Sequence, residues 1–330
     1  MKLTVMKSLS VIFLLTLITL AWFTKLGISP FEPLEATVTT DKSSYRYRQA
    51  VNVYGNVTYE GQQVEEGLVA IQVEDSMSQT IVLRTVPSNT TPSMPLTIET
   101  VSIIPCNASG HPKDNFARNA RAYFKATVRN NVPLDESVLV VVNIFDIDLT
   151  PIGMAWVKLT IPGNQEIFFM PSMWIEDWVS TGTALATANA YEDWPKNNGY
   201  PYCPEKTANF AIEEHASQSP PPTQSTGNYE LTFRIPPHEA PYSDTHFVYV
   251  GAFSQGWKAL QNTTFSVEYQ VPEDFDLNHI IEIYDVVKVT GIYGAKSSGP
   301  KWNPEIDLYP DGQIGIYDLV RVTGIYGSTY

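Results

Sequence analysis

The sequence predicts a mainly β protein in which two β-sandwiches, one inserted in the other, precede a small α-helical module. Three observations carry this prediction. Residues 36–270 alternate short runs rich in Val, Thr, Ile, Tyr and Phe with Gly, Pro and Asn, as strands and turns do. The order of these runs leaves one sandwich open near residue 87 and completes it only after residue 228. Beyond residue 270 the strand pattern stops, and one twelve-residue phrase occurs twice.

The first 25 residues have the pattern of a secretory leader. Lys2 and Lys7 give a positive start, and residues 8–23 form an apolar run without charge. This run is shorter than the ~20 residues of a membrane-spanning helix. Trp22 and Phe23 are bulky, and no small-x-small cleavage site follows them, so a retained N-terminal anchor is the alternative to a cleaved signal peptide. Either reading predicts an exported protein, extracellular or at the cell surface.

The first sandwich is predicted from two separated segments. Four strand-like runs lie at 36–40, 50–59, 68–74 and 80–85. Four strands cannot close a seven-strand sandwich. Three further runs, at 229–235, 245–253 and 263–270, supply the missing strands.

The inserted sandwich is predicted within residues 96–213. Its seven runs lie at 96–104, 122–129, 137–145, 153–161, 166–170, 182–191 and 206–212. Linkers rich in Pro and Ser flank it, at 87–95 and 214–228, and exposed loops accept such insertions when their ends lie close. The alternative is three consecutive domains, which leaves two of them incomplete.

The opening of the first sandwich resembles a macroglobulin-type, immunoglobulin-like domain. The stretch DKSSYRYRQAVNVYGNVTYEGQQVEEGLVAIQV places Tyr45 before a turn, a strand and a G-x-x-V connection. The later stretches GNYELTFRIPP and HFVYVGAF match the end of such a domain. Residues 46–49 depart from the Pro-Gly turn that is usual in that family.

The C-terminal repeat predicts two copies of one small unit. Residues 283–294 read IYDVVKVTGIYG and residues 316–327 read IYDLVRVTGIYG, with ten of twelve positions identical at an offset of 33. In each copy apolar residues recur at helical spacing, and Gly294 and Gly327 stand where a helix stops. We expect the core-facing stripes to be Ile283, Val286, Val287 and Thr290 in the first copy and Ile316, Leu319, Val320 and Thr323 in the second.

Oxygen-bearing residues precede each helix at the spacing of a twelve-residue calcium loop, with ligands at positions 1, 3, 5, 7, 9 and 12. In the first copy these are Asp274, Asp276, Asn278, Ile280 (through its carbonyl), Glu282 and Asp285. In the second they are Asp307, Asp311, Gln313 (through its carbonyl) and Asp318. Tyr309 replaces the position-3 ligand, so the second loop should bind calcium more weakly.

Two alternatives stay open for these loops. His279 stands where position 6 normally holds Gly, and a register starting at Asp276 with a two-residue deletion also fits the first loop. The repeats can also be two acidic, solvated helix–turn units without metal.

Half EF-hands in tandem resemble a type I dockerin module, here over residues 272–330. The resemblance implies that calcium binds the ligands named above and that a cohesin-like domain, or another cell-surface protein domain, is the partner. It also implies that Tyr284 and Tyr317 contact this partner. We expect Ile283 and Ile316 to pack in the small core instead. Immunoglobulin-like domains followed by a dockerin resemble archaeal cell-surface proteins.

Other residues bear on the compartment. Four N-x-S/T sequons, at Asn56, Asn89, Asn107 and Asn262, fit an exported glycoprotein. Cys106 and Cys203 permit one disulfide that would staple the insert, or they are two unrelated buried thiols. The net charge of −14 argues against nucleic acid and against anionic membrane surfaces.

The lack of recognised catalytic motifs in the sequence predicts that the chain is not an enzyme. It contains no H-E-x-x-H, no G-x-S-x-G and no Gly-rich phosphate loop. Pairs of carboxylates such as Asp146 and Asp148 are read as surface charges, and a hydrolase with an unrecognised site is the third-ranked function. Trp156 is expected in a core.

The first-ranked function is attachment of a surface protein through its C-terminal module, and the alternative is a carbohydrate-binding subunit of a polysaccharide-degrading complex. That alternative predicts an exposed row of at least two of Trp174, Trp178, Trp194, Tyr200 and Tyr202.

Overall fold

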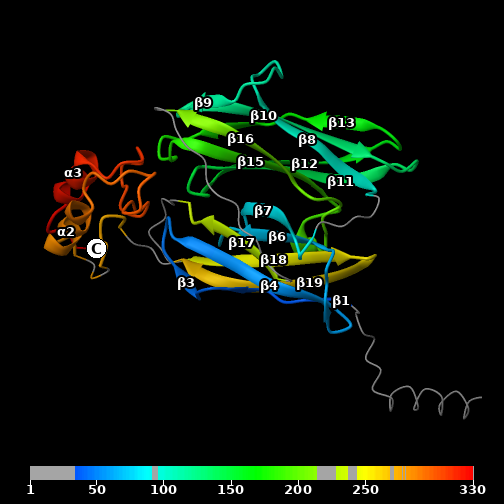
Figure 1. Ribbon diagram of the computed structural model, residues 1–330, viewed down its shortest axis with the longest axis horizontal. Helices are drawn as coiled ribbons and strands as arrows, with labels where there is room; N and C mark the ends of the chain where they lie inside the picture. Colours follow the sequence, from blue (N-terminus) through cyan, green and yellow to red (C-terminus); the bar gives the residue numbers. More distant parts are fainter. Residues whose placement is uncertain are drawn as a thin grey trace, which may run out of the picture. The chain divides into compact units, whose positions relative to one another are not determined.

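The computed structural model describes residues 34–90, 96–213, 228–236, 244–267, 271–276, 278 and 280–329. The predicted leader, almost all of the 214–228 linker, part of the 87–95 linker and His279 lie outside the described residues. The chain is mainly β, as predicted, with β-sandwich sheets and a small helical part at the C-terminus (Figure 1). Within the described residues no helix is long and apolar enough to span a membrane.

The first sandwich is built from two segments that are far apart in sequence. One sheet has the order β1 (Leu34–Ala36), β4 (Ala50–Tyr59) and β17 (Asn228–Arg234), with the short β2 (Thr39–Thr40) and β5 (Gln62–Gln63) also on β4. The other has the order β3 (Ser44–Tyr45), β19 (Trp257–Val267), β18 (Asp244–Ser254), β6 (Leu68–Glu74) and β7 (Thr80–Pro87). Val53 opposes Leu231 and Ile71 opposes Val250, so each sheet contains strands from both segments (Figure 1).

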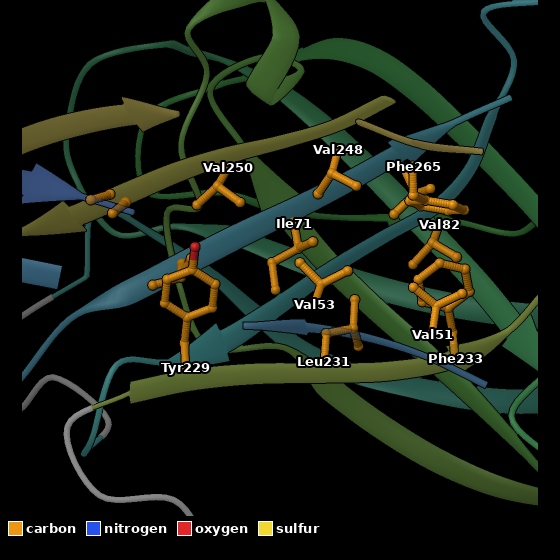
Figure 2. Packing of buried hydrophobic residues seen from close by; sticks show 14 of the residues in the cluster. Val51, Val53, Ile71, Val82, Tyr229, Leu231, Phe233, Val248, Val250 and Phe265 are labelled. Atoms are coloured by element: carbon orange, nitrogen blue, oxygen red, sulfur yellow. The ribbon is translucent and has the colours of Figure 1, made fainter. Parts of the chain in front are cut away.

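The core of this sandwich follows from residue alternation. Along β4 buried and exposed positions alternate, since successive side chains point to opposite faces of a sheet. Val51 and Val53 from β4, with Leu231 and Phe233 from β17, fill one side of the core. The other side is supplied by Ile71, Val82, Val248, Val250 and Phe265 (Figure 2).

The turn at 46–49 explains the departure from Pro-Gly. The Gln49 N–H donates to the Arg46 carbonyl oxygen at 3.1 Å, and Arg48 between them has φ +63°. A positive φ at the third turn position is the place for Gly in a type II turn. Arg48 therefore adopts the backbone that Gly normally provides, and its side chain lines a small pocket with Asp146, Asp148 and Arg234.

The strands of residues 98–213 pair with one another and form the two sheets of a second sandwich. One sheet joins β8 (Ile98–Cys106), β10 (Ala120–Asn130), β13 (Glu166–Phe169) and β14 (Ser172–Ile175). The other has the order β12 (Pro151–Ile161), β11 (Glu136–Phe145), β15 (Gly182–Tyr191), β16 (Lys206–Glu213) and β9 (Asn115–Ala117). Phe116, Phe124 and Phe210 meet in its core with ring centroids 5.1–6.0 Å apart.

The inner sheets of the two sandwiches pack against each other. Ala70 and Leu83 of the first sandwich form one buried cluster with Leu139, Val141 and Tyr191 of the second. All of β6 and nearly all of β11 are buried on both faces, which explains their continuous apolar runs LVAIQV and VLVVV. The 3₁₀ turn η1 (Pro195–Asn197) belongs to this joint, since the Lys196 ammonium pairs with the buried Glu74 carboxylate.

The aromatic predictions for the insert are corrected by this packing. Trp156 is 53% exposed, because it lies on the outer face of β12, where its ring meets Trp194 edge-on at 5.6 Å. Tyr200 stacks on Phe253 of the first sandwich at 4.9 Å. The 194–202 loop therefore packs between the sandwiches. Of the five aromatic residues expected in a row, only Trp174 is largely exposed.

The predicted disulfide is wrong. Cys106 and Cys203 are both free and buried. The Sγ of Cys203 accepts a hydrogen bond from the Thr100 N–H at 3.2 Å, and Thr100 and Cys106 are six residues apart on β8. Six residues of strand span about 20 Å, far more than the ~7 Å limit between bridged Cα atoms. The alternative of two unrelated buried thiols is correct.

The C-terminal module consists of two equivalent halves. Its helices are α2 (Ile283–Gly291) and α3 (Ile316–Gly324), and its core contains Ile281, Val289, Ile306, Leu308, Ile314 and Val322. The Ile314 N–H donates to the Ala295 carbonyl oxygen at 2.8 Å, and 33 residues away the Ile281 N–H donates to that of Ser328 at 2.9 Å. Each loop is thus paired with the backbone that follows the other helix.

Candidate metal centre

The first loop brings three carboxylates together. Asp274, Asp276 and Asp285 each offer an oxygen, and these oxygens lie within 4.8 Å of one another. Asp274 and Asp285 are fully buried, whereas Asp276 is exposed. The cluster therefore joins positions 1, 3 and 12 of the twelve-residue register, including Asp274, which lies before the alternative register that starts at Asp276.

The remaining polar side chains of this loop are joined to the cluster. Asn278 donates from its amide to Asp276 Oδ2 at 3.3 Å and to Glu282 Oε1 at 3.1 Å. Its own Oδ1 accepts from the Ile280 N–H at 2.8 Å. Loop positions 3, 5 and 9 therefore already converge through hydrogen bonds.

Asp285 links the loop to the start of α2. Its Oδ2 accepts from the Glu282 N–H at 2.8 Å, and Glu282 is the N-cap of the helix. Its Oδ1 accepts from the Phe275 N–H at 2.7 Å, near the beginning of the loop. A carboxylate at the third helical position that bonds the N-cap N–H is half of a capping box.

The second loop repeats the bond to the N-cap, but its last carboxylate also accepts from the third loop position, where the first loop uses the second position. Asp318 Oδ2 accepts from the Gly315 N–H at 2.7 Å, and its Oδ1 accepts from the Tyr309 N–H at 2.8 Å. Asp307 Oδ2 accepts from the Gly312 N–H at 2.9 Å, and Gly312 has φ +78°. A Gly of positive φ at position 6 makes the sharp turn of a twelve-residue calcium loop.

One carboxylate oxygen of Asp307 is buried without a hydrogen-bond partner among the described residues. The residue is 2% exposed, and its Oδ1 has no hydrogen-bond partner in the described part of the chain. Burial first, and then the charge of Asp318, raise the pKa of the Asp307 carboxyl to about 7. The Arg48 guanidinium, which donates to the Asp307 carbonyl oxygen at 2.7 Å, opposes this rise. The ionised Asp307 carboxylate therefore lacks sufficient compensation from a positive charge or from a hydrogen-bond donor.

Asp311 and Gln313 of this loop are linked by a local hydrogen bond. Asp311 Oδ1 accepts from the Gln313 N–H at 2.8 Å. Tyr309 is 44% exposed, and its ring lies 5.1 Å from that of Tyr317. At position 3 the second loop thus presents an aromatic ring beside Tyr317 where the first presents Asp276.

The donors of both loops fit a hard cation. They are carboxylate, amide and carbonyl oxygens, the ligand types that calcium prefers in proteins. Each loop contains two buried carboxylates, and in the second loop Asp307 Oδ1 has no hydrogen-bond partner among the described residues. Buried carboxylates need a compensating positive charge.

The helices present apolar side chains outward as well as inward. Val289 and Val322 are buried, but Ile283 and Ile316 are 55% and 52% exposed. The expectation that these two Ile pack in the core is wrong, because the buried stripe runs through Asp285 and Val289, one step around the helix. Val287 and Val320, which share the outward face, and Thr290 and Thr323 are exposed too.

Tyr284 and Tyr317, the residues predicted to contact a partner, are 63% and 62% exposed. In each repeat the Ile, Tyr and Val just described (Ile283, Tyr284 and Val287; Ile316, Tyr317 and Val320) make one outward apolar surface, which we call the helix surface. The module therefore carries this surface twice.

One interaction of the module was missed from sequence. Arg321 Nε donates to Glu273 Oε1 at 2.7 Å and its Nη1 donates to the Leu308 carbonyl oxygen at 2.9 Å. It thereby joins the second loop to the segment before the first. A signal was present, since position 321 is Arg where the first copy has Lys288, and only the guanidinium offers this fork of donors.

The sequons lie on strands and turns near the surface. Asn56, Asn107 and Asn262 are exposed, and Asn89 is half-buried with its amide on Glu65. Glycosylation at these positions stays a prediction.

No protein-family model and no curated protein matches the chain. Among solved structures, the C-terminal domain of Wzt is similar over 38% of this chain and 76% of that chain, at 12% identity and TM-score 0.31. A Niemann-Pick type C2 protein from Japanese carpenter ant is similar over 37% and 96%, at 13% identity and TM-score 0.27. A β-glucosidase from Erythrobacter marinus is similar over 42% of this chain but only 19% of its own, at 11% identity and TM-score 0.28. The functional proposal rests on the residues of the chain itself.

Proposed function

We propose that the chain is a non-enzymatic, exported cell-surface protein that attaches to an extracellular assembly through a calcium-dependent, dockerin-like C-terminal module. The observation that carries this proposal is the pair of equivalent loops, each with two buried carboxylates at its first and last positions. Buried carboxylates without a counter-charge destabilise a fold, and a divalent cation removes that cost.

The proposal assigns a role to each group of ligands. Asp274 and Asp285 in the first loop, and Asp307 and Asp318 in the second, hold calcium from buried positions. Asp276, Asn278, Glu282 and Asp311 complete the shells from the solvent side, with the carbonyls of Ile280 and Gln313. The second loop offers three carboxylates where the first offers four, since Tyr309 and Gly315 occupy positions 3 and 9, and so binds calcium more weakly.

Calcium would also order the helix surface. Asp285 and Asp318 each bond the N-cap N–H of the following helix, so the last ligand of a loop and the first turn of a helix are one structure. The two helix surfaces present the same residue types, and either can face a cohesin-like or other protein domain. Calcium binding and folding are then a single equilibrium.

Binding to a cohesin domain tests this proposal. The protein is passed over immobilised cohesin domains in about 2 mM calcium, above the 10⁻⁴–10⁻³ M dissociation constants of extracellular calcium modules, and again with a chelator. Retention in calcium only, lost when Tyr284→Ala and Tyr317→Ala are combined but not with either alone, supports attachment through two equivalent surfaces. Loss in the double variant Tyr54→Ala and Tyr249→Ala, whose residues lie on strands of the first sandwich, would place the contact elsewhere.

A further inference from the structure

The outer face of the inserted sandwich carries aromatic and cationic side chains in one line. Along β10 the buried residues Ala122, Phe124 and Ala126 alternate with Arg121, Tyr123 and Lys125, which therefore point away from the core. The strand contains three cations and no carboxylate, in a chain of net charge −14.

Neighbouring strands add exposed rings to the same face. Trp174 of β14 opposes Arg121, and Phe168 of β13 opposes Thr127, in one continuous antiparallel register (β10 and β13 side by side in Figure 1). Directly opposed residues of paired strands lie on the same face of a sheet. Trp174 is 43% exposed and Phe168 is 60% exposed. We call Trp174, Arg121, Tyr123, Lys125 and Phe168 the aromatic–basic face.

The two central cations are available for a ligand. Arg121 donates to the Ser172 hydroxyl at 3.2 Å, and the Lys125 ammonium lies 4.6 Å from the centroid of the Phe168 ring. Among the described carboxylates none lies within salt-bridge distance of either cation. Arg129, at the far end of the strand, differs, because Glu166 pairs with it at 2.8 Å.

The spacing of the face suits an extended chain of rings. Trp174 and Phe168 are six residues apart on one edge of β10, which corresponds to about 20 Å. Tyr123 and Lys125 lie between these two rings, and Arg121 lies beside Trp174. An aromatic ring offers a flat apolar face, and Arg binds carboxylate and sulfate groups through paired donors.

We propose that the aromatic–basic face binds an acidic polysaccharide, a chain of sugar rings that bears carboxylate or sulfate groups. Sugar rings stack on Trp174, Tyr123 and Phe168, and Arg121 and Lys125 pair with the anionic groups. A narrow row of separate rings with two cations beside them fits a ribbon-like polymer better than a broad lipid surface. This site is independent of the calcium loops and does not rest on the proposed attachment.

Native gel electrophoresis of the full protein through soluble polysaccharide tests the proposal. Polygalacturonate carries the carboxylate and its methyl ester carries the same rings without charge, while dextran sulfate and dextran make the corresponding sulfate pair. A chelator is present throughout, so that calcium cannot bridge the protein and the polymer. We expect retardation by at least one acidic polymer, with apparent affinity about tenfold or more above that of its neutral counterpart.

Substitutions locate the site. Trp174→Ala and Arg121→Gln should each weaken retardation by about tenfold, the effect of losing a strong contact. The matched controls are Trp257→Ala, a 45% exposed Trp on β19, and Lys206→Gln, an exposed cation at the start of β16. Both should leave retardation unchanged, and unchanged melting temperatures show that all four variants fold.

Three results would overturn the proposal. They are equal retardation by acidic and neutral polymers, no retardation by either acidic polymer, and control substitutions as damaging as those in the face. Binding to anionic phospholipid vesicles with the same pattern of variants, in place of polymer binding, would also reject the polysaccharide.

Discussion

Asp285 and Asp318 occupy the same place in the two C-terminal repeats. Each carboxylate accepts a hydrogen bond from the N–H three residues before it, at 2.8 Å from Glu282 and 2.7 Å from Gly315. Both residues are buried at the start of a helix. One carboxylate thus closes the loop and begins the helix, which is why metal binding and helix formation should be inseparable in this module.

Asp285→Asn should reduce the stabilisation of the module by calcium. Asn keeps the shape and one acceptor but removes the negative charge that a cation needs. We expect calcium affinity of the first loop to fall by about 100-fold, and the calcium-dependent gain in stability to fall with it. Thermal unfolding with calcium and with a chelator measures this gain. Asp135→Asn, at an exposed loop position of the insert, is the control, and equal behaviour of the two variants would contradict the assignment.

Removal of residues 325–330 should damage the first calcium loop, about fifty residues earlier in the chain. The Ile281 N–H donates to the Ser328 carbonyl oxygen at 2.9 Å, and the Gly327 N–H donates to that of Ile281 at 2.7 Å. Truncation leaves both backbone groups of the buried Ile281 without these partners, a cost of about 1–3 kcal/mol each. Amide hydrogen exchange should show lost protection at 274–285. Loss confined to the second loop would show that the crosswise pairing is not formed.

Asn143→Ala should loosen the joint between the sandwiches. The Asn143 amide donates to the Leu83 carbonyl oxygen at 2.7 Å, and its Oδ1 accepts from the Leu83 N–H at 3.2 Å. These groups are buried, so Ala leaves a backbone donor and acceptor unsatisfied and should cost about 2–4 kcal/mol. Chemical denaturation measures the loss. The exposed Asn209→Ala on β16 should change the free energy of unfolding by less than ~0.5 kcal/mol.

The expectation that Asp146 and Asp148 are surface charges is wrong, because Asp146 is buried and Asp148 is half-buried. This pair predicts a stability that falls as pH rises. Burial first, and then the charge of Asp148, raise the pKa of the buried Asp146 to about 7, and burial also raises the pKa of Asp148. The folded state therefore holds a proton that the unfolded state releases near pH 4. This contribution is complete below pH 4 and is lost as pH passes 7.

Asp146→Asn should flatten that dependence. Between pH 5 and pH 8 the wild-type protein should lose about 2–3 kcal/mol more than the variant. Asn retains the Oδ1 that accepts from the N–H groups of Asp148 and Thr150, at 3.0 and 2.9 Å. Denaturation curves at the two pH values decide the matter, and parallel losses in both proteins would show that Asp146 is ionised throughout.

The strands were predictable because residue type and spacing set them locally. The alternation along β4 and the runs of residues 68–74 and 137–145 were found from sequence. What the sequence did not reveal was which strands are covered on both faces. β6 and β11 are apolar throughout because a second sheet lies on their outer side, and this depends on packing between distant segments. The prediction that Trp156 lies in a core was wrong for the same reason. The residues next to it in sequence do not show that its face of β12 is exposed to solvent.

The candidate loops were predictable because their ligands are close together in sequence. The outward position of Ile283 and Ile316 could not be predicted. The spacing of apolar residues indicates an apolar stripe on a helix, but it does not identify the side of the helix that faces the core. Asp285 and Asp318 compete for the inner side of each helix, and a pattern of apolar residues ignores buried carboxylates. The predicted disulfide between Cys106 and Cys203 was wrong because Cys203 lies beside Thr100, whereas Cys106 is at the far end of β8. Sequence alone does not show which part of β8 Cys203 contacts.

Calcium titration of the protein by calorimetry, with circular dichroism in parallel, tests the central claim most directly. The account predicts one tight and one weaker site, a gain of helical signal as the first fills, and reversal by a chelator. Asp285→Asn should weaken binding at the tight site, and Asp318→Asn should weaken binding at the other site. A protein that shows no heat and no helical change in millimolar calcium would contradict the account, and the repeats would then be a packing element without metal.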